Sequence, residues 1–438
     1  MWTVQRQLLP SVGRWMSSGG GGGYVAVRRS RPLKDASTAQ PAETINRADQ
    51  SGLLRKFLRD KIRATGPISV ADYMQLSQSC YYSSPRKLLG NRGDFTTSPE
   101  ISQVFGELLA VYILHEVASL GHQGQCQLIE LGPGSGRLMA DILKALAQLK
   151  AISRFSVHLV ETSDTLAKAQ AVTLGVTQLQ HQPNDSCFQR GGVSGMEACS
   201  AHWYRTLTDV PDDFNVILAN EFFDALPVHC FRREESASKA WREVCVDAGE
   251  DDAFRFVLAS APTLASSLFL PTEESEEDAG RSDWEFSPLS SAIMDTVGRK
   301  VSQNGGHSLI VDYGHLGERK SCSLRAYRAM QEVHPLSSPG ATDITTDVNF
   351  AQLRDHALSC GNLVFGPISQ RDFLLNLGLS HRLAKAEESD EAVRLLTSHQ
   401  EMGTRFKVLA TFPSTSADIF QVRKAPAGFE PLDHKANS

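Results

Sequence analysis

Apolar residues follow two different periods in the middle of the chain. Short, nearly continuous apolar runs occupy residues 127–131, 157–160 and 215–219, and such runs are typical of buried strands. Between them, residues 137–150 and 165–172 carry apolar positions three or four residues apart, which predicts helices. Strands that alternate with helices indicate an α/β protein with a parallel sheet that is covered on both faces.

The N-terminal third predicts helices around a polar loop. Helical spacing occupies residues 50–64 and 70–78, and a polar loop follows at residues 91–100. Ser98 is a candidate N-cap for a helix over residues 101–120, because a proline follows it at the first helical position.

The C-terminal half mixes strand and helix patterns. Residues 173–201 are polar and poorly patterned, so we expect an insertion there. The acidic segment at residues 273–278 is expected to be an exposed loop. The remaining expected elements are strands at residues 228–232, 242–246, 254–258, 307–312 and 406–412, and helices at residues 287–301, 349–358 and 370–377.

The composition is that of an ordinary globular protein, with 41% hydrophobic and 21% charged residues in a chain of 438. A net charge of −6 gives no indication of a basic nucleic-acid-binding surface. No apolar run approaches the ~20 residues that span a bilayer. The eight cysteines are scattered without a C-x-x-C pair, and the histidines show no ligand spacing. We therefore expect reduced core thiols and no metal site.

Residues 1–45 differ from the rest of the chain. No Asp or Glu precedes Asp35, whereas five arginines and several large apolar residues lie in this stretch. Such a composition is typical of a mitochondrial transit peptide, in which the glycine run at residues 19–23 would be a spacer near the cleavage region. A disordered tail is the alternative.

Glycines mark the turn between the first central strand and its helix. Residues 128–136 read LIELGPGSG, so Gly132, Gly134 and Gly136 follow Glu130. Glycine lets the chain adopt positive φ and lets a ligand approach the backbone at a helix N-terminus. A dinucleotide-binding turn has the spacing G-x-G-x-x-G, but here the pattern is E-x-G-x-G-x-G. This form is associated with the class I fold that binds S-adenosylmethionine (SAM), and a turn that only packs a helix on a sheet is the alternative.

Other residues are candidates for contacts to the same cofactor. Glu161 follows the second strand, about 25 residues after the last motif glycine, where an acid can accept hydrogen bonds from both ribose hydroxyls. A solvated acid at a strand end is the alternative. Asp94, Thr97 and Ser98 lie in the loop GDFTTSP, which could close over the cofactor, although helix capping explains Ser98 equally well.

Polar residues also follow the strand at residues 215–219. The sequence NVILANEFFDALP places Asn220, Glu221 and Asp224 directly after the apolar run, where open α/β sheets bind ligands. Two neighbouring carboxylates can bind a guanidinium group and orient its nitrogen. These three residues are therefore our candidates for binding and orienting the methyl acceptor. The alternative is that the acids stabilise a helix N-terminus. Asp312, at another strand end, is an equally open candidate for a site or a structural role.

Six motifs occur in one order along residues 50 to 412 and resemble the MidA-like methyltransferase family: GDFTTSPEIS, LIELGPGSGRL, HLVETS, ANEFFDALPVHCF, DYG with SLRAY, and PGATDITTDVNF. The resemblance implies a class I (Rossmann-like) methyltransferase sheet with a helical N-terminal extension and α/β insertions. It also implies that SAM binds at Gly132, Gly134, Gly136 and Glu161. Many relatives have Gly-Thr where this chain has Ser321-Cys322, so the resemblance does not predict the conformation of this turn.

The mitochondrial members of this family are complex I assembly factors. The resemblance therefore implies a SAM-dependent protein-arginine methyltransferase of the mitochondrial matrix. Its partner would be a core subunit of the peripheral arm of complex I, on which it makes symmetric ω-N dimethylarginine. Better-known arginine methyltransferases carry two glutamates on a hairpin and a T-H-W loop, and neither is evident here. A guanidinium clamp by Glu221 and Asp224 is thus a hypothesis.

These observations divide the chain into four expected segments. They are a transit peptide and disordered tail at residues 1–45, a helical region at 46–120, the methyltransferase domain with insertions at 121–415, and a tail at 416–438. Two rival functions stay open. One is an assembly chaperone that binds SAM without catalysis, and the other is a nicotinamide-dependent oxidoreductase, against which the missing G-x-G-x-x-G counts.

Overall fold

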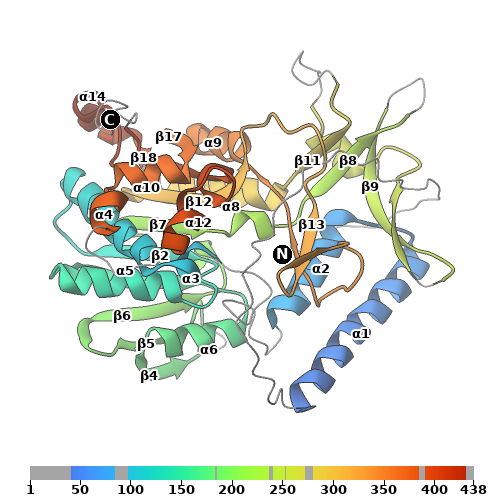
Figure 1. Ribbon diagram of the computed structural model, residues 1–438, viewed down its shortest axis with the longest axis horizontal. Helices are drawn as coiled ribbons and strands as arrows, with labels where there is room; N and C mark the ends of the chain where they lie inside the picture. Colours follow the sequence, from blue (N-terminus) through green and yellow to red (C-terminus); the bar gives the residue numbers. More distant parts are fainter. Residues whose placement is uncertain are drawn as a thin grey trace.

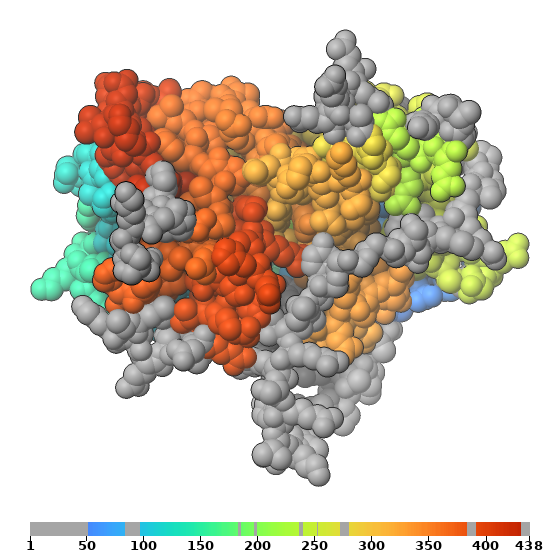
Figure 2. Space-filling view, turned by 45° about the horizontal axis from the view of Figure 1, so that its top comes forward, coloured from blue at the N-terminus to red at the C-terminus, as the bar shows by residue number. Residues whose placement is uncertain are grey.

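The computed structural model describes residues 41–83, 97–182, 185–235, 240–251, 253–271, 280–383 and 390–430. Two lobes lie side by side, one built on a large sheet and the other on a smaller sheet with the N-terminal helices (Figure 1). In Figure 2 the C-terminal residues, in red, lie at the upper left over the first lobe, and the yellow-green strands of the smaller sheet lie at the right. Asp94, the loop expected at residues 273–278 and most of the expected transit peptide lie outside the described residues.

The large sheet has the strand order β17-β18-β12-β7-β2-β3-β6-β5-β4, and β16 pairs with β12. Its central strands, from β12 to β6, are parallel, and antiparallel strands extend both edges. The strands are β2 (Cys126–Leu131), β3 (Phe155–Val160), β4 (Val176–His181), β5 (Cys187–Val193), β6 (Met196–Tyr204), β7 (Asn215–Asn220), β12 (Gly306–His315), β16 (Val348–Asn349), β17 (Asn362–Ser369) and β18 (Phe406–Pro413).

The helices of this lobe are α3 (Ser98–Ile101), α4 (Gln103–Ser119), α5 (Arg137–Gln148), α6 (Asp164–Thr173), α8 (Pro288–Asn304), α9 (Phe350–Ser359), α10 (Gln370–Asn376), α11 (Leu379–Leu383), α12 (Asp390–Thr397), α13 (Met402–Arg405) and α14 (Ala417–Arg423). Consecutive residues of the central strands face opposite sides of the sheet. Leu128 and Val216 pack in the core that contains α4 and α5, whereas Ile129 and Ile217 pack in the core that contains α8 and α9. Burial on both faces explains why these strands are continuous apolar runs in the sequence.

The order of the strands reverses between β2 and β7. The chain continues from β2 to β3 on one side, while β7 lies on the other side of β2. Open α/β sheets bind ligands in the crevice at the carboxyl ends of two such strands. The register runs from Gln127 opposite Asn215 to Leu131 opposite Ala219, so the glycine turn and Asn220 emerge at the same edge.

The second lobe is assembled from distant parts of the chain. Its core joins Leu58, Tyr73, Val246 and Ile344, which come from the N-terminal helices and from insertions after β7 and β12. Its elements are α1 (Pro41–Thr65), α2 (Val70–Ser83), α7 (Leu264–Phe269), β1 (Ile68–Ser69), β8 (His229–Arg233), β9 (Trp241–Ala248), β10 (Phe254–Leu258), β11 (Asp283–Phe286), β13 (Arg325–Arg328), β14 (Gln331–Val333) and β15 (Asp343–Thr345). Nowhere in the described part of the chain is a helix both long and apolar enough to cross a membrane.

The helix expected over residues 101–120 is divided in two. Ser102 has extended backbone angles, φ −150° and ψ 132°, and separates α3 from α4. The Ser102 hydroxyl accepts a hydrogen bond from the amide of Val104 and caps α4. Thr97 is the N-cap residue of α3. The expectation that Ser98 caps one long helix is therefore wrong, because a second serine takes this role where the helix restarts.

Most of the polar stretch at residues 173–201 adds strands to the edge of the large sheet. β6 pairs in parallel with β3, and β5 and β4 continue the sheet in an antiparallel hairpin. β4 is an almost fully exposed edge strand, which explains the polar, poorly patterned sequence. The other expected strands and helices within the described residues are present. The helix expected from residue 50 already begins at Pro41, and the remaining bounds shift by a few residues.

Candidate functional site

The turn between β2 and α5 requires glycine at its motif positions. Gly132, Gly134 and Gly136 have φ values of 60°, 54° and 79°, in the left-handed region that favours glycine. A Cβ at Gly132 would lie 2.7 Å from a ring carbon of Phe222, closer than real Cβ contacts allow. The turn therefore presents backbone without side chains at the carboxyl end of β2.

Glu161 lies beyond the end of β3 and is tied to the glycine turn. Its carboxylate accepts hydrogen bonds from the amide of Ser163 (2.8 Å) and from the side chain of Gln170 (2.9 Å). The same Gln170 nitrogen donates to the carbonyl of Gly134 (3.0 Å). Burial raises the pKa of Glu161, and these donors oppose the rise. Gln170 thus holds the candidate ribose acid and the glycine turn in one arrangement.

Glu130 is the acid of the motif and points into the protein. Its side chain is 3% exposed, and Oε2 has no hydrogen-bond partner among the described residues. Burial raises its pKa to about 8. A buried carboxyl oxygen without a partner costs free energy, so this atom is a natural contact for a ligand donor.

The residues after β7 place two carboxyl groups at the same edge. Glu221 has φ 50°, which is uncommon and strained for a residue with a side chain. Its amide donates to the carbonyl of Val311 (2.8 Å), and its Oε1 accepts from the amide of Ser98 (2.9 Å). Oδ1 of Asn220 and Oδ1 of Asp224 are buried and have no partner among the described residues.

Burial dominates the acid–base properties of these carboxyl groups. It raises the pKa of Glu221 to about 8, and the neighbouring Asp224 adds to the rise. It raises the pKa of Asp224 to about 6, while a hydrogen bond from Tyr313 opposes the rise. Two buried acids with pKa values pushed apart in this way are typical of functional sites.

Asp312 holds the turn that carries these acids. Its Oδ2 accepts hydrogen bonds from the amides of Phe222 (3.1 Å), Phe223 (2.9 Å) and Asp224 (3.3 Å). Burial and the charges of Asp224 and Glu221 raise the pKa of Asp312. Its Oδ1 accepts a fourth hydrogen bond, from the amide of Tyr313 (3.0 Å). With four amide donors, Asp312 has a structural role in shaping the turn.

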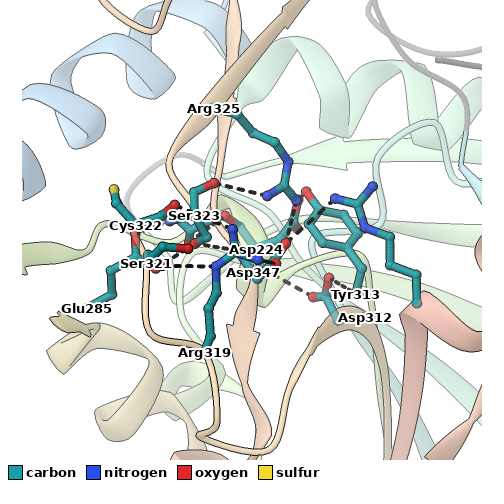
Figure 3. Close-up of polar contacts among 12 residues, drawn as sticks. Asp224, Glu285, Asp312, Tyr313, Arg319, Ser321, Cys322, Ser323, Arg325 and Asp347 are labelled. Carbon is teal, nitrogen blue, oxygen red and sulfur yellow. Dashed lines mark hydrogen bonds and ion pairs between the residues drawn. The ribbon is translucent and has the colours of Figure 1, made fainter. Parts of the chain in front are cut away.

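Residues that the sequence analysis did not single out complete the cluster. The Tyr313 hydroxyl donates a hydrogen bond to Asp224 (Figure 3). The guanidinium carbons of Arg325 and Arg405 lie 4.8 and 5.1 Å from the centre of the Tyr313 ring. The Asp347 carboxylate pairs with both arginines, at 2.7 and 3.6 Å. Tyr313, Arg325 and Asp347 lie within the motifs DYG, SLRAY and TTDVNF, and this was their only signal in the sequence.

Thr97 and the start of α3 face the glycine turn from the other side. Ser135 in the turn donates a hydrogen bond to Glu100 of α3 (2.6 Å). The Thr97 side chain makes no capping hydrogen bond. The structure therefore brings Thr97, Glu221 and the glycine turn to one edge of the sheet.

A cleft of about 950 Å³ opens beside the carboxyl cluster. Phe223, Glu285, Arg319 and Asp347 are among its lining residues, together with the first turn of α9. Phe223 directly precedes Asp224, and Asp347 pairs with the arginines beside Tyr313, so the cleft lies next to the turn that carries the two acids.

A model of S-adenosyl-L-methionine-dependent methyltransferases matches residues 108–368. The chain belongs to this family. The protein arginine methyltransferase NDUFAF7 homolog, mitochondrial, of Caenorhabditis elegans is 37% identical, over 91% of this chain and 93% of that protein. The protein arginine methyltransferase NDUFAF7, mitochondrial, of Danio rerio is 39% identical, over 86% of this chain and 92% of that protein.

Solved structures from Burkholderia thailandensis are similar over nearly their whole length. One, bound to S-adenosyl-homocysteine, has a TM-score of 0.69 and 26% identity, covering 88% of this chain and 98% of that one. A native structure from the same organism has a TM-score of 0.66 and 25% identity, covering 87% of this chain and 96% of that one. The family and these structures confirm the expected Rossmann-like methyltransferase fold, the enzyme class and SAM as the cofactor. The open glycine turn and the unpartnered oxygen of Glu130 fit such a ligand.

Proposed function

We propose that this enzyme methylates an arginine side chain of a protein substrate in the mitochondrial matrix. The finer proposal is symmetric ω-N dimethylation of a core subunit in the peripheral arm of complex I. The observation that carries the proposal is the pair of half-buried Glu221 and buried Asp224 at the carboxyl end of β7, beside the glycine turn. The names of the curated relatives support arginine as the acceptor and mitochondria as the location.

On the cofactor side, we assign contacts to the motif residues. Gly132, Gly134 and Gly136 leave room for SAM against the backbone, and Glu161 accepts hydrogen bonds from the ribose. Glu130 and Thr97 are assigned to the remaining polar groups of the cofactor. SAM supplies an electrophilic methyl group, which the acceptor nitrogen must approach in line.

On the acceptor side, Glu221 and Asp224 hold the guanidinium group. Arginine stays cationic in proteins, so a desolvated guanidinium needs a compensating carboxylate, and two carboxylates also fix the direction of its nitrogen. Methylation releases one proton from the acceptor. The charge of a bound guanidinium favours the ionised form of Glu221. Once ionised, Glu221 has the higher pKa and is the stronger base of the two, while Asp224 is held in place by Tyr313.

Acceptor orientation by these acids predicts that Glu221→Gln or Asp224→Asn slows methyl transfer far more than it weakens SAM binding. Each amide keeps the shape and removes the charge, so a misplaced acceptor should cost about 10²-fold in rate for at least one of them. Transfer of labelled methyl from SAM to the candidate complex I subunit, with SAM affinity measured in parallel, separates the two effects. Mass spectrometry of the product identifies the residue and its degree of methylation.

A matched control is the exposed Glu332→Gln on β14, which removes a carboxylate outside the cluster and should leave the rate unchanged. Wild-type rates in both cluster variants would assign Glu221 and Asp224 to local structure. Transfer to lysine or to the protein N-terminus would contradict arginine as the acceptor.

A non-catalytic SAM-binding assembly chaperone is the second candidate. It would need the glycine turn but would have no use for two desolvated carboxyl groups. The strained φ of Glu221 and the raised pKa values at this turn favour the enzyme, because such features are costly and cluster at reacting centres. No methyl transfer to any complex I subunit, together with tight SAM binding, would favour the chaperone.

The proposed mitochondrial location also implies that the N-terminal segment contains a transit peptide. A transit peptide within residues 1–45 would direct import and be removed. The helical region at 46–120, the methyltransferase domain at 121–415 and the C-terminal segment at 416–438 would remain. N-terminal sequencing of the protein recovered from mitochondria tests this assignment. An intact N-terminus in the imported protein would contradict it.

A further inference from the structure

Two cysteines and a glutamate meet in the second lobe, away from the glycine turn. Cys230 lies on β8, Glu285 on the neighbouring β11, and Cys322 in the segment that leads to β13. One potential ligand atom from each residue lies within 4.8 Å of the others. The Sγ atoms of Cys322 and Cys230 are 3.2 and 4.0 Å from Oε1 of Glu285.

We propose that Cys230, Glu285 and Cys322 form a binding site for a zinc ion. Zinc in proteins favours tetrahedral sites made of thiolate, imidazole and carboxylate ligands. With zinc–sulfur and zinc–oxygen bonds of about 2.3 and 2.0 Å, the edge between a sulfur and an oxygen ligand is about 3.5 Å. The two observed separations lie on either side of this value, so the ligands need only small movements.

The surroundings of Glu285 are those of an oriented ligand. Ser323 donates two hydrogen bonds to its carboxylate, from the amide (2.7 Å) and from the hydroxyl (2.5 Å), as Figure 3 shows. Such outer contacts fix the direction of a ligating carboxylate. Zinc would take the place of the Cys322 thiol proton, which now points at the same oxygen.

A small cavity provides room for the fourth ligand. Cys230 and Cys322 both line a cavity of about 80 Å³, which is large enough for water. Asp283 also lines it but is engaged by Arg232 at 2.6 Å, so a water molecule is the better fourth ligand. The site is then a Cys₂Glu set completed by water.

The place of this site in the fold gives it a structural role. It would fasten β8 and β11 to the segment that carries Arg319 and Arg325, two of the three arginines that pair with Asp347. Zinc would thereby join the second lobe to the residues around Tyr313. The ligands come from distant parts of the chain, so no sequence spacing reveals them.

Binding of metal to the full-length protein tests the proposal. The protein is freed of metal with a chelator and its thiols are kept reduced. It is then titrated with Co²⁺, whose visible absorption reports tetrahedral thiolate coordination, and afterwards with Zn²⁺. We expect one tetrahedral Co²⁺ per chain, displaced by Zn²⁺, and a rise in Tm with Zn²⁺. Cys230→Ser and Cys322→Ser should each weaken binding at least about tenfold.

Controls distinguish loss of ligands from loss of fold. Cys245→Ser removes another buried thiol of the same sheet and should keep the wild-type spectrum. Glu285→Gln keeps the side-chain shape, so it should retain the metal-free Tm and lose most of the rise with Zn²⁺. Absence of a tetrahedral spectrum in the reduced wild type would overturn the proposal. Equal spectra in the wild type and both serine variants would overturn it, as would a Cys230–Cys322 disulfide in the native protein.

Discussion

At the scale of single residues, Glu161 contacts the start of α6 and lies beside the glycine turn. Ser163 and Gln170 occupy one side of each carboxylate oxygen, and each oxygen keeps a further lone pair for a ribose hydroxyl. Its side chain is 6% exposed, so it is not the solvated strand-end acid that the sequence allowed. These contacts are compatible with a cofactor role and also with an anchor for the start of α6.

Glu161→Ala is expected to weaken SAM binding by about 1.5–3 kcal/mol, the range for a hydrogen bond to a charged group. Calorimetric titration with SAM and with its 2′-deoxyribose analogue distinguishes the two roles. The analogue should bind less well than SAM to the wild type, and the difference should shrink in the variant. Asp164→Ala, an exposed acid at the start of α6, is the control. If the difference in affinity between SAM and the analogue were the same in the wild type and in Glu161→Ala, Glu161 would only anchor α6.

Glu221 should lower the free energy of unfolding, because its position raises its pKa. Its pKa is about 8 in the folded protein against an ordinary value of 4.5. Between these pH values the folded state holds a proton that the unfolded state has released, so the free energy of unfolding falls as the pH rises. Glu221→Gln removes this dependence while keeping an oxygen for the amide of Ser98.

The Tm of Glu221→Gln is therefore expected to exceed that of the wild type by an amount that grows from pH 4.5 to 8. Thermal unfolding at several pH values measures the difference, and Glu332→Gln should follow the wild type. A difference that is constant with pH would show that Glu221 is already ionised in the folded protein.

At the scale of elements, the ends of β7 and β12 build the acidic cluster together. The parallel register places Val311 of β12 opposite Asn220 of β7, so the residues that follow, Asp312 and Glu221, leave the sheet side by side. Asp312 then binds the amides of the turn after β7, and Tyr313 binds Asp224. Two strand ends thus determine where both candidate acceptor carboxylates lie.

Tyr313→Phe should move the pH dependence of methyl transfer. The Tyr313 hydrogen bond opposes the rise in the pKa of Asp224, so its loss should raise this pKa above about 6. The lower of the two ionisations on the acidic limb of kcat/KM against pH, which belongs to Asp224, should shift to higher pH. Tyr73→Phe, which removes a hydroxyl bonded to the carbonyl of Pro335 in the second lobe, is the control. A lower rate with an unchanged profile would indicate that Tyr313 acts by packing alone.

Local patterns predicted strands β2, β3, β7, β12 and β18 of the large sheet, because these strands are mostly buried. They did not predict β4, β5, β6 or β17. The glycine turn and the strand ends followed from the same patterns. Arg325 and Asp347 were not predicted as members of the cluster, because their place beside Tyr313 depends on which strand ends lie next to each other. The break at Ser102 was also missed, because Pro99 and the apolar spacing fit one continuous helix equally well.

At the scale of the whole molecule, pairing between strands far apart in the sequence determines how the second lobe is assembled, which local patterns do not predict. β1 pairs with β9, which joins the N-terminal helices to the insertion after β7. Sequence patterns indicate a helical region and separate insertions, and they contain no signal for the pairing between these parts of the chain. The C-terminal residues are similar: the segment expected as a tail from residue 416 contains α14, and Phe420 packs into the main core.

The C-terminal segment is held by a buried ion pair. Glu116 of α4 is fully buried, and its carboxylate accepts two hydrogen bonds from Arg423 (2.8 Å each) and one from the amide of Ala427 (2.9 Å). Although burial opposes ionisation, these donors lower the pKa of Glu116 below its ordinary value. The stabilisation is therefore present above pH 4.5 and is lost as the pH falls through the lowered pKa.

Arg423→Ala should lower the free energy of unfolding by about 3 kcal/mol, because it leaves a buried carboxylate without its partner. This figure is at the lower end for buried pairs, since the Arg423 side chain is 21% exposed. Urea unfolding at pH 7 measures the loss, and Arg299→Ala, an exposed arginine of α8, should cost far less. Adding Glu116→Gln to Arg423→Ala removes the unpaired charge and should restore part of the stability. If Arg423→Ala alone were as stable as the wild type, the C-terminal segment would be a tail that rests on α4 without supporting it.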